Sequence, residues 1–570
     1  MTGHMRRGKS RTPRFGRLAR HFLTRLADYE LVAPGGEAHQ TAVTGMALLG
    51  ALNFVIALSM VAREVLAPAG FEKVRAVTML GDASLLVSMT MLFTALAGAL
   101  AWDGFFPNKQ DAMTLGSLPL RPALLLQARV LAILLYLAAV VISTNMFTAL
   151  VLPVCDALNG GIVQVLRSLL GWGVAVAAAA ATVFFAQIAV QGLLLAVLPY
   201  ALYLRLSAFL QMGIVLATFL GFFLMPSATQ ALGTPLQRNL WIVPWWFVGL
   251  YTNIRGGPGA LPDVYAMAGV AAPVAAGCVA LIVYRGEYRR ILRNVCEQSE
   301  AQPGRSSTVR LRLERVFNSM LLRNFRARAV FWFVARTVTR NRRHRMLLAI
   351  ATAIGIAWAG QSLAQVIGSG WAALRRPSPA LLIVPLELAC LLVIGLRALY
   401  AVPVDLQASW IFRITERGGI RPVRQAAVRF LWTVAILPVA WLPLPICWML
   451  WGMNRAVFHC AFVTLTGAAL LEILMRNFDK MPFACSILPG KNNLRVTFAV
   501  YVAEFTFFCY FVAVLEESML RSAIGMAWGL ALPSAVWLVS TVKRRIQEQP
   551  GRIRFDETGQ PELELLQLHG

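Results

Sequence analysis

Acidic side chains inside long apolar runs are the residues of this sequence best able to do chemistry. Glu387 and Glu504 each lie within such a run, and Arg397 lies later in the same run as Glu387. A carboxylate inside a membrane costs free energy, so it is by default a candidate for a functional site such as an ion, proton or substrate pathway. The alternative is structural: Glu387 or Glu504 pairs with Arg397, or with Ser, Thr or Asn of a neighbouring helix, and only holds the helices together.

Motifs for catalysis or cofactor binding are absent from the sequence. There is no GxxxxGK[ST] loop to hold phosphates, so the chain is not expected to hydrolyse ATP by itself. The six histidines form no HExxH-like set, and the eight cysteines form no CxxC pair, so neither a metal site nor a disulfide framework is predicted. No Ser/His/Asp or Cys/His arrangement is present. The sequence therefore predicts no enzyme, no cofactor and no metal in this chain.

Composition indicates a protein of the lipid bilayer. The 570 residues are 58% hydrophobic and 14% charged, whereas soluble domains carry about 25% charged residues. Apolar runs of about 20 residues are long enough to cross a membrane as helices. We therefore expect an all-α membrane protein with about 12 transmembrane helices in two six-helix halves. The expected spans are about 41–62, 83–102, 123–152, 169–198, 207–225, 266–284, 346–364, 380–402, 430–450, 457–474, 496–515 and 522–542.

A basic segment at residues 285–345 fixes the expected orientation. It is rich in arginine and too polar to cross a bilayer, and positive charge favours the cytoplasmic side. Both termini are then cytoplasmic, and most of the formal charge of +26 faces the cytoplasm, where it meets anionic lipid rather than nucleic acid. No cleavable signal peptide is expected at the N-terminus, so the first span would direct insertion.

The expected organisation has five parts. A basic N-terminal segment (1–40) precedes the first membrane half (41–284), the basic cytoplasmic linker (285–345), the second membrane half (346–542) and a cytoplasmic tail (543–570). Each half is preceded by an amphipathic segment, at 15–29 and at 316–338, suited to lie in the membrane interface.

One short pattern occurs twice, 300 residues apart. Arg121-Pro122 precedes Arg129, and Arg421-Pro422 precedes Arg429, each time at the start of the third span of a half. Proline suits the first turn of a helix, and an arginine two turns later can extend back to the lipid headgroups. The pattern favours two related halves, with Arg129 and Arg429 expected at the headgroup layer.

An aromatic stretch at 241–247 lies before the sixth span. It is too short to cross a bilayer, and its aromatic content favours an interfacial or re-entrant piece. Trp241, Trp245 and Trp246 are therefore expected at the outer headgroup level.

Three cytoplasmic loops mix aromatic, proline and charged residues, which is typical of a docking surface. In the first, Phe105 and Phe106 are expected to be exposed for a partner; the alternative is that they turn back into the headgroups. The docking candidates are Asp103, Phe105, Phe106, Pro107, Asp111, Arg121 and Pro122 in the first loop, Trp410, Arg413 and Glu416 in the second, and Pro482, Cys485, Pro489 and Gly490 in the third.

The first loop resembles that of type-2 ABC exporter permeases, in which an aspartate-containing loop leads through a Leu-Pro segment into the third span. The matching residues are Asp103, Asp111, Leu118-Pro119 and Arg121-Pro122. The other loops look like those of large bacterial members that join two such units. The resemblance implies an inner-membrane exporter subunit whose separate ABC ATPase subunit binds ATP. This sequence departs from the pattern of that family at spans 11 and 12, which lie too close together for a second re-entrant piece. A secondary transporter and a membrane-embedded enzyme acting on lipid are the alternatives.

Overall fold

The computed structural model describes most of the chain, and its regular elements there are all helices. The described residues are 12–27, 38–65, 72–107, 122–157, 161–232, 240–256, 260–294, 318, 324–404, 412, 414, 419–476, 478, 480–484 and 494–547.

Helices long and apolar enough to cross a membrane confirm an all-α, multi-span membrane protein. Ten of them occur in the part of the chain that the structure describes: Thr78–Leu100, Ala123–Asn145, Gly161–Val197, Leu206–Leu224, Asp263–Gly286, Arg343–Gly368, Pro379–Leu399, Ile420–Trp451, Met453–Leu474 and Ala523–Lys543. The remaining two expected spans, about 41–62 and 496–515, fall on the helices Ala38–Val65 and Leu494–Met519. The total of twelve spans and the cytoplasmic termini stay predictions.

The chain divides into two compact units, Met1–Pro303 and Gly304–Gly570. The division falls inside the basic segment 285–345. Each unit is described separately below.

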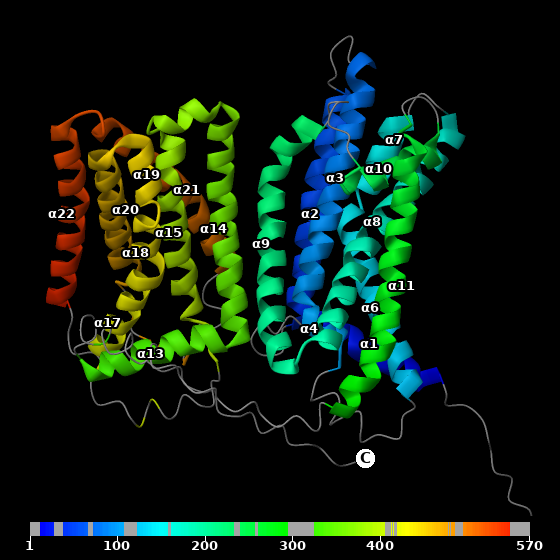
Figure 1. The fold of residues 1–570 in the computed structure, drawn as a ribbon, viewed down its shortest axis with the longest axis horizontal. Helices are drawn as coiled ribbons and strands as arrows, with labels where there is room; N and C mark the ends of the chain where they lie inside the picture. Colours follow the sequence, from blue (N-terminus) through cyan, green and yellow to red (C-terminus); the bar gives the residue numbers. More distant parts are fainter. Residues whose placement is uncertain are drawn as a thin grey trace, which may run out of the picture. The chain divides into compact units, whose positions relative to one another are not determined.

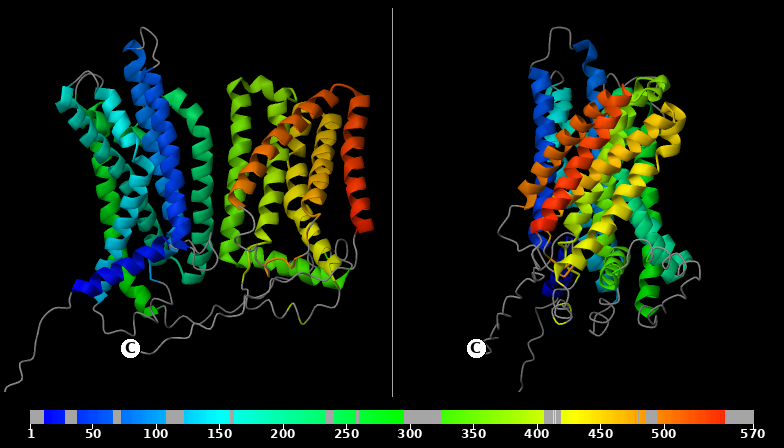
Figure 2. Two further views of the ribbon diagram at one scale, coloured as in Figure 1. Left: turned by 180° about the vertical axis from the view of Figure 1, so that it is seen from behind. Right: turned by 90° about the vertical axis from the view of Figure 1, so that its left-hand side faces the viewer.

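Unit 1 is a helical bundle built around α3 (Figures 1 and 2). The central helix α3 contacts α6, α8 and α9, while α1 packs across α6 and α10 packs between α8 and α11. Within this unit, α1 and α4 lie at one end and α7 and α10 lie at the other (Figure 1). The elements are α1 (Thr12–Ala27), α2 (Ala38–Val65), α3 (Glu72–Leu100), α4 (Trp102–Phe105), α6 (Pro122–Asn145), α7 (Thr148–Ala157), α8 (Gly161–Val197), α9 (Tyr200–Leu232), α10 (Pro244–Arg255) and α11 (Asp263–Asn294).

The third expected span, 123–152, is broken between α6 and α7 rather than continuous. Asn53 of α2 fills the break with four hydrogen bonds. Its Nδ2 donates to Thr144 O (2.7 Å) and Thr148 Oγ1 (2.8 Å), and its Oδ1 accepts from the amides of Phe147 (2.8 Å) and Thr148 (3.1 Å). Backbone groups at a helix break need such partners in an apolar environment.

The aromatic stretch 241–247 before the sixth span leads into the short helix α10, and its tryptophans differ in environment. Trp245 is fully buried in the core of unit 1, whereas Trp241 is 88% exposed. Trp245 therefore packs inside the protein, and the expected depth of the three tryptophans at the outer headgroup level stays a prediction. The helix α10 lies directly against the backbone of α11, since a Cβ on Gly269 of α11 would lie 2.5 Å from Trp246 O.

Unit 2 repeats much of this plan (Figure 2). Its elements are α13 (Phe325–Arg340), α14 (Arg342–Gly368), the 3₁₀ helix η2 (Trp371–Arg375), α15 (Pro379–Leu399), α17 (Ile420–Leu431), the π-helical turn η4 (Trp432–Ile436), α18 (Leu437–Trp441), α19 (Leu444–Trp451), α20 (Met453–Leu474), α21 (Leu494–Met519) and α22 (Ala523–Gln547). The expected span 430–450 is interrupted because Pro438, Pro443 and Pro445 cannot donate backbone hydrogen bonds.

Helix pairing in the two units corresponds. The amphipathic helix α13 packs against α17 as α1 packs against α6; α15 contacts α20 and α21 as α3 contacts α8 and α9; and α20 packs against α22 as α8 packs against α11. The short helix α10 has no counterpart in unit 2, because only residues 520–522 separate α21 from α22.

Candidate functional site

Residues 95–107, here called the α3–α4 segment, form the candidate site. They comprise the last turns of α3, a turn at Ala101, the single-turn helix α4 and the first residues of the loop that follows. The final carbonyl groups of a helix have no partner within that helix. In an apolar bundle these carbonyls must be satisfied by other parts of the protein.

Seven backbone carbonyls of the α3–α4 segment accept hydrogen bonds from side chains of four other helices. The bonds are Gln187 Nε2 to Ala95 O (2.9 Å), Tyr136 Oη to Ala97 O (3.1 Å), Gln211 Nε2 to Ala99 O (2.5 Å), Gln191 Nε2 to Trp102 O (3.0 Å), Arg129 Nη2 to Gly104 O (3.0 Å) and Phe106 O (3.1 Å), and Tyr284 Oη to Phe105 O (2.8 Å). The donors come from α6, α8, α9 and α11. A movement of the α3–α4 segment is thereby tied to most of unit 1.

Arg129 is the charged member of this set. It is 2% exposed, and its guanidinium lies over the ring of Phe22 of α1, 5.1 Å from the ring centroid. The expectation that Arg129 extends to the headgroups is wrong, because Gly104 O and Phe106 O offer charge-assisted hydrogen bonds inside the protein. Arg129 thus joins α1, α6 and the α3–α4 segment.

Phe105 and Phe106 are buried, at 0% and 5% exposure, so the expectation that they are exposed for docking is wrong. Phe105 packs against Phe184 at 5.2 Å and Phe106 against Tyr284 at 5.0 Å between ring centroids. Both rings belong to the core that α1 helps to cover, so they do not turn back into headgroups either. Pro107 is buried as well, whereas Asp103 on α4 is exposed.

Of the remaining docking candidates, a few lie in the described part of the structure and most lie outside it. Pro482 is buried in the turn 480–484, so it is not an exposed docking contact. Pro122 begins α6, but its side chain is outside the described residues. The residues wholly outside the described part are Asp111, Arg121, Trp410, Arg413, Glu416, Cys485, Pro489 and Gly490.

The equivalent segment of unit 2, residues 400–404, is held mainly by another loop. Phe483 N donates to Tyr400 O (2.9 Å), and Val404 N donates to Phe483 O (3.0 Å). His344 Nε2 donates to Val402 O (3.0 Å). The second and third of the candidate docking loops therefore contact each other, which the sequence did not predict.

Phe483 adopts an unusual backbone conformation at this contact. Its φ of 63° is the one positive value at a non-glycine among the described residues. A bulky residue in that region is strained. Its ring is 1% exposed and packs against His344 at 4.7 Å and Tyr400 at 5.6 Å between centroids. Aromatic packing and the two backbone hydrogen bonds hold the strained turn.

Glu387 does not pair as the structural alternative required. Glu387 is 3% exposed and forms no hydrogen bond or ion pair with any residue that the structure describes. Arg397 instead lies over the ring of Phe478, at 4.9 Å. Pairing of Glu387 with Arg397 is therefore wrong. The side chain of Glu504 lies outside the described residues.

A buried His–Glu pair in unit 2 was missed by sequence reasoning. His459 Nδ1 and Glu516 Oε1 lie 2.6 Å apart, with side chains 2% and 0% exposed. The ring of Trp451 lies 5.6 Å from that of His459. The expected span ended at about residue 515, just before Glu516, but α21 continues to Met519 and carries Glu516 into the bundle. The sequence signal for this pair was an acid at the end of a long apolar run, together with a histidine in the apolar run before it.

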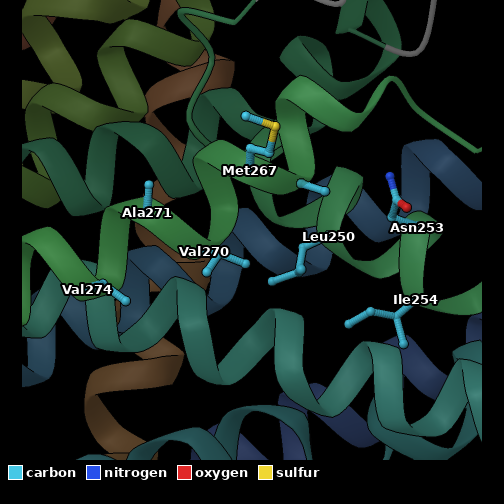
Figure 3. A pocket seen from close by; sticks show the side chains of 8 residues that line it. Leu250, Asn253, Ile254, Met267, Val270, Ala271 and Val274 are labelled. Atoms are coloured by element: carbon cyan, nitrogen blue, oxygen red, sulfur yellow. The ribbon is translucent and has the colours of Figure 1, made fainter.

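An apolar groove of about 580 Å³ lies between α10 and α11 (Figure 3). Met267, Val270 and Val274 line it and are exposed. Its polar lining residue, Asn253, donates through Nδ2 to Asp263 Oδ1 at 2.8 Å. The groove therefore offers apolar contacts rather than groups for catalysis.

No group of three or more His, Cys, Asp or Glu within the described ranges is placed to hold a metal ion. No protein-family model, curated protein or solved structure matches this chain significantly.

Proposed function

We propose that this chain is the membrane-spanning permease subunit of an ABC-type exporter, without an ATPase of its own. In this proposal, a separate ATPase subunit binds ATP and contacts the cytoplasmic loops of a multi-pass protein in the bacterial inner membrane. The observation that carries the proposal is the set of seven carbonyls in the α3–α4 segment that α6, α8, α9 and α11 bind.

The geometry supports transmission of force from the loop to the helices. A partner that displaces α4 must either move the donor helices or break their hydrogen bonds. Leaving a buried donor or acceptor without a partner costs about 1–3 kcal/mol each, so moving the helices is favoured. The buried Phe105 and Phe106 make the segment stiff, and the exposed Asp103 is the described residue placed to meet the partner.

Reconstitution with an ATPase subunit tests this proposal. The variant Asp103→Ala/Asp111→Ala is expected to fold normally but to lower substrate-stimulated ATP turnover about tenfold, equivalent to about 1.4 kcal/mol of coupling. The matched control is Glu517→Ala, an acid near the end of α21 whose side chain is 31% exposed. If the double variant keeps the wild-type ratio of ATPase on co-purification and its turnover still responds to substrate, the loop is not the coupling element.

Topology is a separate part of the proposal. With both termini in the cytoplasm, single cysteines placed at residues 300 and 560 are expected to resist an impermeant external thiol reagent. Labelling of either position in intact cells would contradict this orientation.

A secondary transporter is the second candidate, favoured by the buried acids of unit 2. Glu387 and the His459–Glu516 pair lie within apolar helices, where titratable groups commonly mark proton or ion pathways. Transport by the purified chain in vesicles with an imposed proton gradient, without ATP, would favour this candidate. Transport that needs both ATP and an ATPase subunit would favour the exporter.

A further inference from the structure

The start of unit 2 carries positive charge without nearby acids in the sequence. No Asp or Glu occurs between Glu314 and Glu387. Over the same stretch, α13 and the first turn of α14 are rich in arginine. Arg336 and Arg340, on α13, are exposed and form no ion pair with a residue that the structure describes. Arg336 and Arg340 therefore lack an acidic partner among the described residues, which favours an anion at this surface.

A groove on this surface combines charge with aromatic side chains. It has a volume of about 680 Å³, and its lining includes Arg336, Arg340, Trp332, Phe333 and Val404. The two arginines lie four residues apart, so their side chains project from the same face of α13, one helical turn from each other. Trp332 and Phe333 are partly buried and give the groove an apolar floor.

The position of the groove relative to a span sets its depth. Only Asn341 separates α13 from α14, and its side chain caps α14 by accepting from Arg343 N at 2.9 Å. Because α14 is long and apolar enough to cross a membrane, α13 lies where that span begins. The groove is therefore at the depth of the lipid headgroups, where an amphipathic helix places its apolar face toward the acyl chains.

We propose that this groove binds the phosphate of an anionic phospholipid. The guanidinium groups of Arg336 and Arg340 bind phosphate oxygens in a planar, bidentate manner. The apolar floor of Trp332, Phe333 and Val404 accepts the glycerol and the first acyl carbons. A protein partner with an acidic helix has similar charge, but the depth at the start of a span favours lipid. The proposal does not depend on the transport activity proposed above.

Lipid retention by the full-length chain tests the site. The protein is purified in detergent, exposed to an equal mixture of phosphatidylglycerol and phosphatidylcholine, and the retained lipids are measured by native mass spectrometry. The wild type is expected to retain phosphatidylglycerol preferentially. The variant Arg336→Gln/Arg340→Gln is expected to lose this preference by roughly tenfold or more, since each basic residue near an anionic surface contributes about 1 kcal/mol.

Two further variants separate a built site from diffuse charge. Arg326→Gln/Arg328→Gln removes two exposed arginines of the same helix that do not line the groove, and it is expected to keep the preference. Arg336→Lys/Arg340→Lys is expected to keep part of it, because charge remains but bidentate binding is lost. An equal loss in the Arg326/Arg328 variant would overturn the proposal. So would a groove variant that keeps its lipid preference while losing an ATPase partner.

Discussion

The two units satisfy the same structural need in different ways. In unit 1, the α3–α4 segment is held by side chains of four long helices, with Arg129 at its centre. In unit 2, residues 400–404 are held by the backbone of Phe483 and by His344. The first arrangement ties a loop to the membrane helices, whereas the second ties one loop to another. Two units with the same arrangement of helices can therefore connect the equivalent loop to different parts of the protein.

The two units also differ in one short helix and in one buried polar pair. Unit 1 has the short helix α10 inserted between α8 and α11, and unit 2 has no such helix between α21 and α22. Unit 2 has a buried His459–Glu516 pair between α20 and α21. We infer that the units have specialised from a common plan, and the following variants test that inference.

The largest effect is expected from Arg129→Leu. This change leaves Gly104 O and Phe106 O without their side-chain donor and removes the contact with Phe22. The expected loss of stability is about 3–5 kcal/mol, measured by thermal unfolding of the purified chain in detergent. Arg429→Leu is the matched control from the repeated motif. The guanidinium of Arg429 has no hydrogen bond or ion pair with a described residue, so about 1 kcal/mol or less is expected. Equal losses would show that the two units use this arginine alike.

Substitutions of Phe483 are expected to have the second-largest effect on stability. Phe483→Ala removes a fully packed ring and is expected to cost about 3 kcal/mol. Phe483→Gly removes the same ring but relieves the positive φ, so it is expected to be less destabilising than alanine by about 1 kcal/mol. Unfolding of the two variants side by side makes the comparison. If glycine is as harmful as alanine, backbone strain at this turn is not part of its energetics.

Gly269→Ala tests the helix that only unit 1 possesses. The added Cβ would lie 2.5 Å from Trp246 O, a backbone atom that cannot rotate away. A loss of about 1–3 kcal/mol is expected from this overpacking. Gly277→Ala, also on α11, is the control because its Cβ would meet Phe185 at an ordinary 3.5 Å. Thermal stability of both variants in detergent is the measurement, and indistinguishable values would argue against close α10–α11 contact.

The smallest effect on stability is expected from Glu516→Gln. Glutamine keeps a group able to bond His459 and removes the buried charge, so a change of about 1 kcal/mol is expected. Glu517→Gln, at its half-buried neighbour that pairs with Arg521, is expected to change stability by less than about 0.5 kcal/mol. Proton-driven transport offers a second readout. A variant that loses such transport with little loss of stability would assign the pair to function rather than to packing.

Local features were predicted well from the sequence. The apolar runs gave the long helices. The amphipathic segments predicted at 15–29 and 316–338 overlap the helices α1 and α13, while residues 28–29 and most of 316–323 lie outside the described part. Arg-Pro correctly marked the starts of α6 and α17. The close spacing of the last two spans correctly excluded a second α10. All of these depend on residues near one another in the chain.

Side-chain partners were not predictable in the same way. Arg129 and Arg429 have identical local spacing, yet Arg129 is buried because it meets carbonyls 23 and 25 residues earlier. His459 and Glu516 are 57 residues apart. Phe105 and Phe106 looked exposed because the helix that covers them, α1, lies far back in the sequence. Such partners depend on which helices meet, and that is set by packing of the whole unit.

Asn53 has a consequence for biogenesis. Its side chain spans the break between α6 and α7 with four hydrogen bonds, but α2 is synthesised before either helix. Until they arrive, the amide of Asn53, in the middle of the long helix α2, has no such partners. We therefore expect the inserted state of α2 to gain stability once α6 and α7 are also in the bilayer, because Asn53 then finds its hydrogen-bond partners.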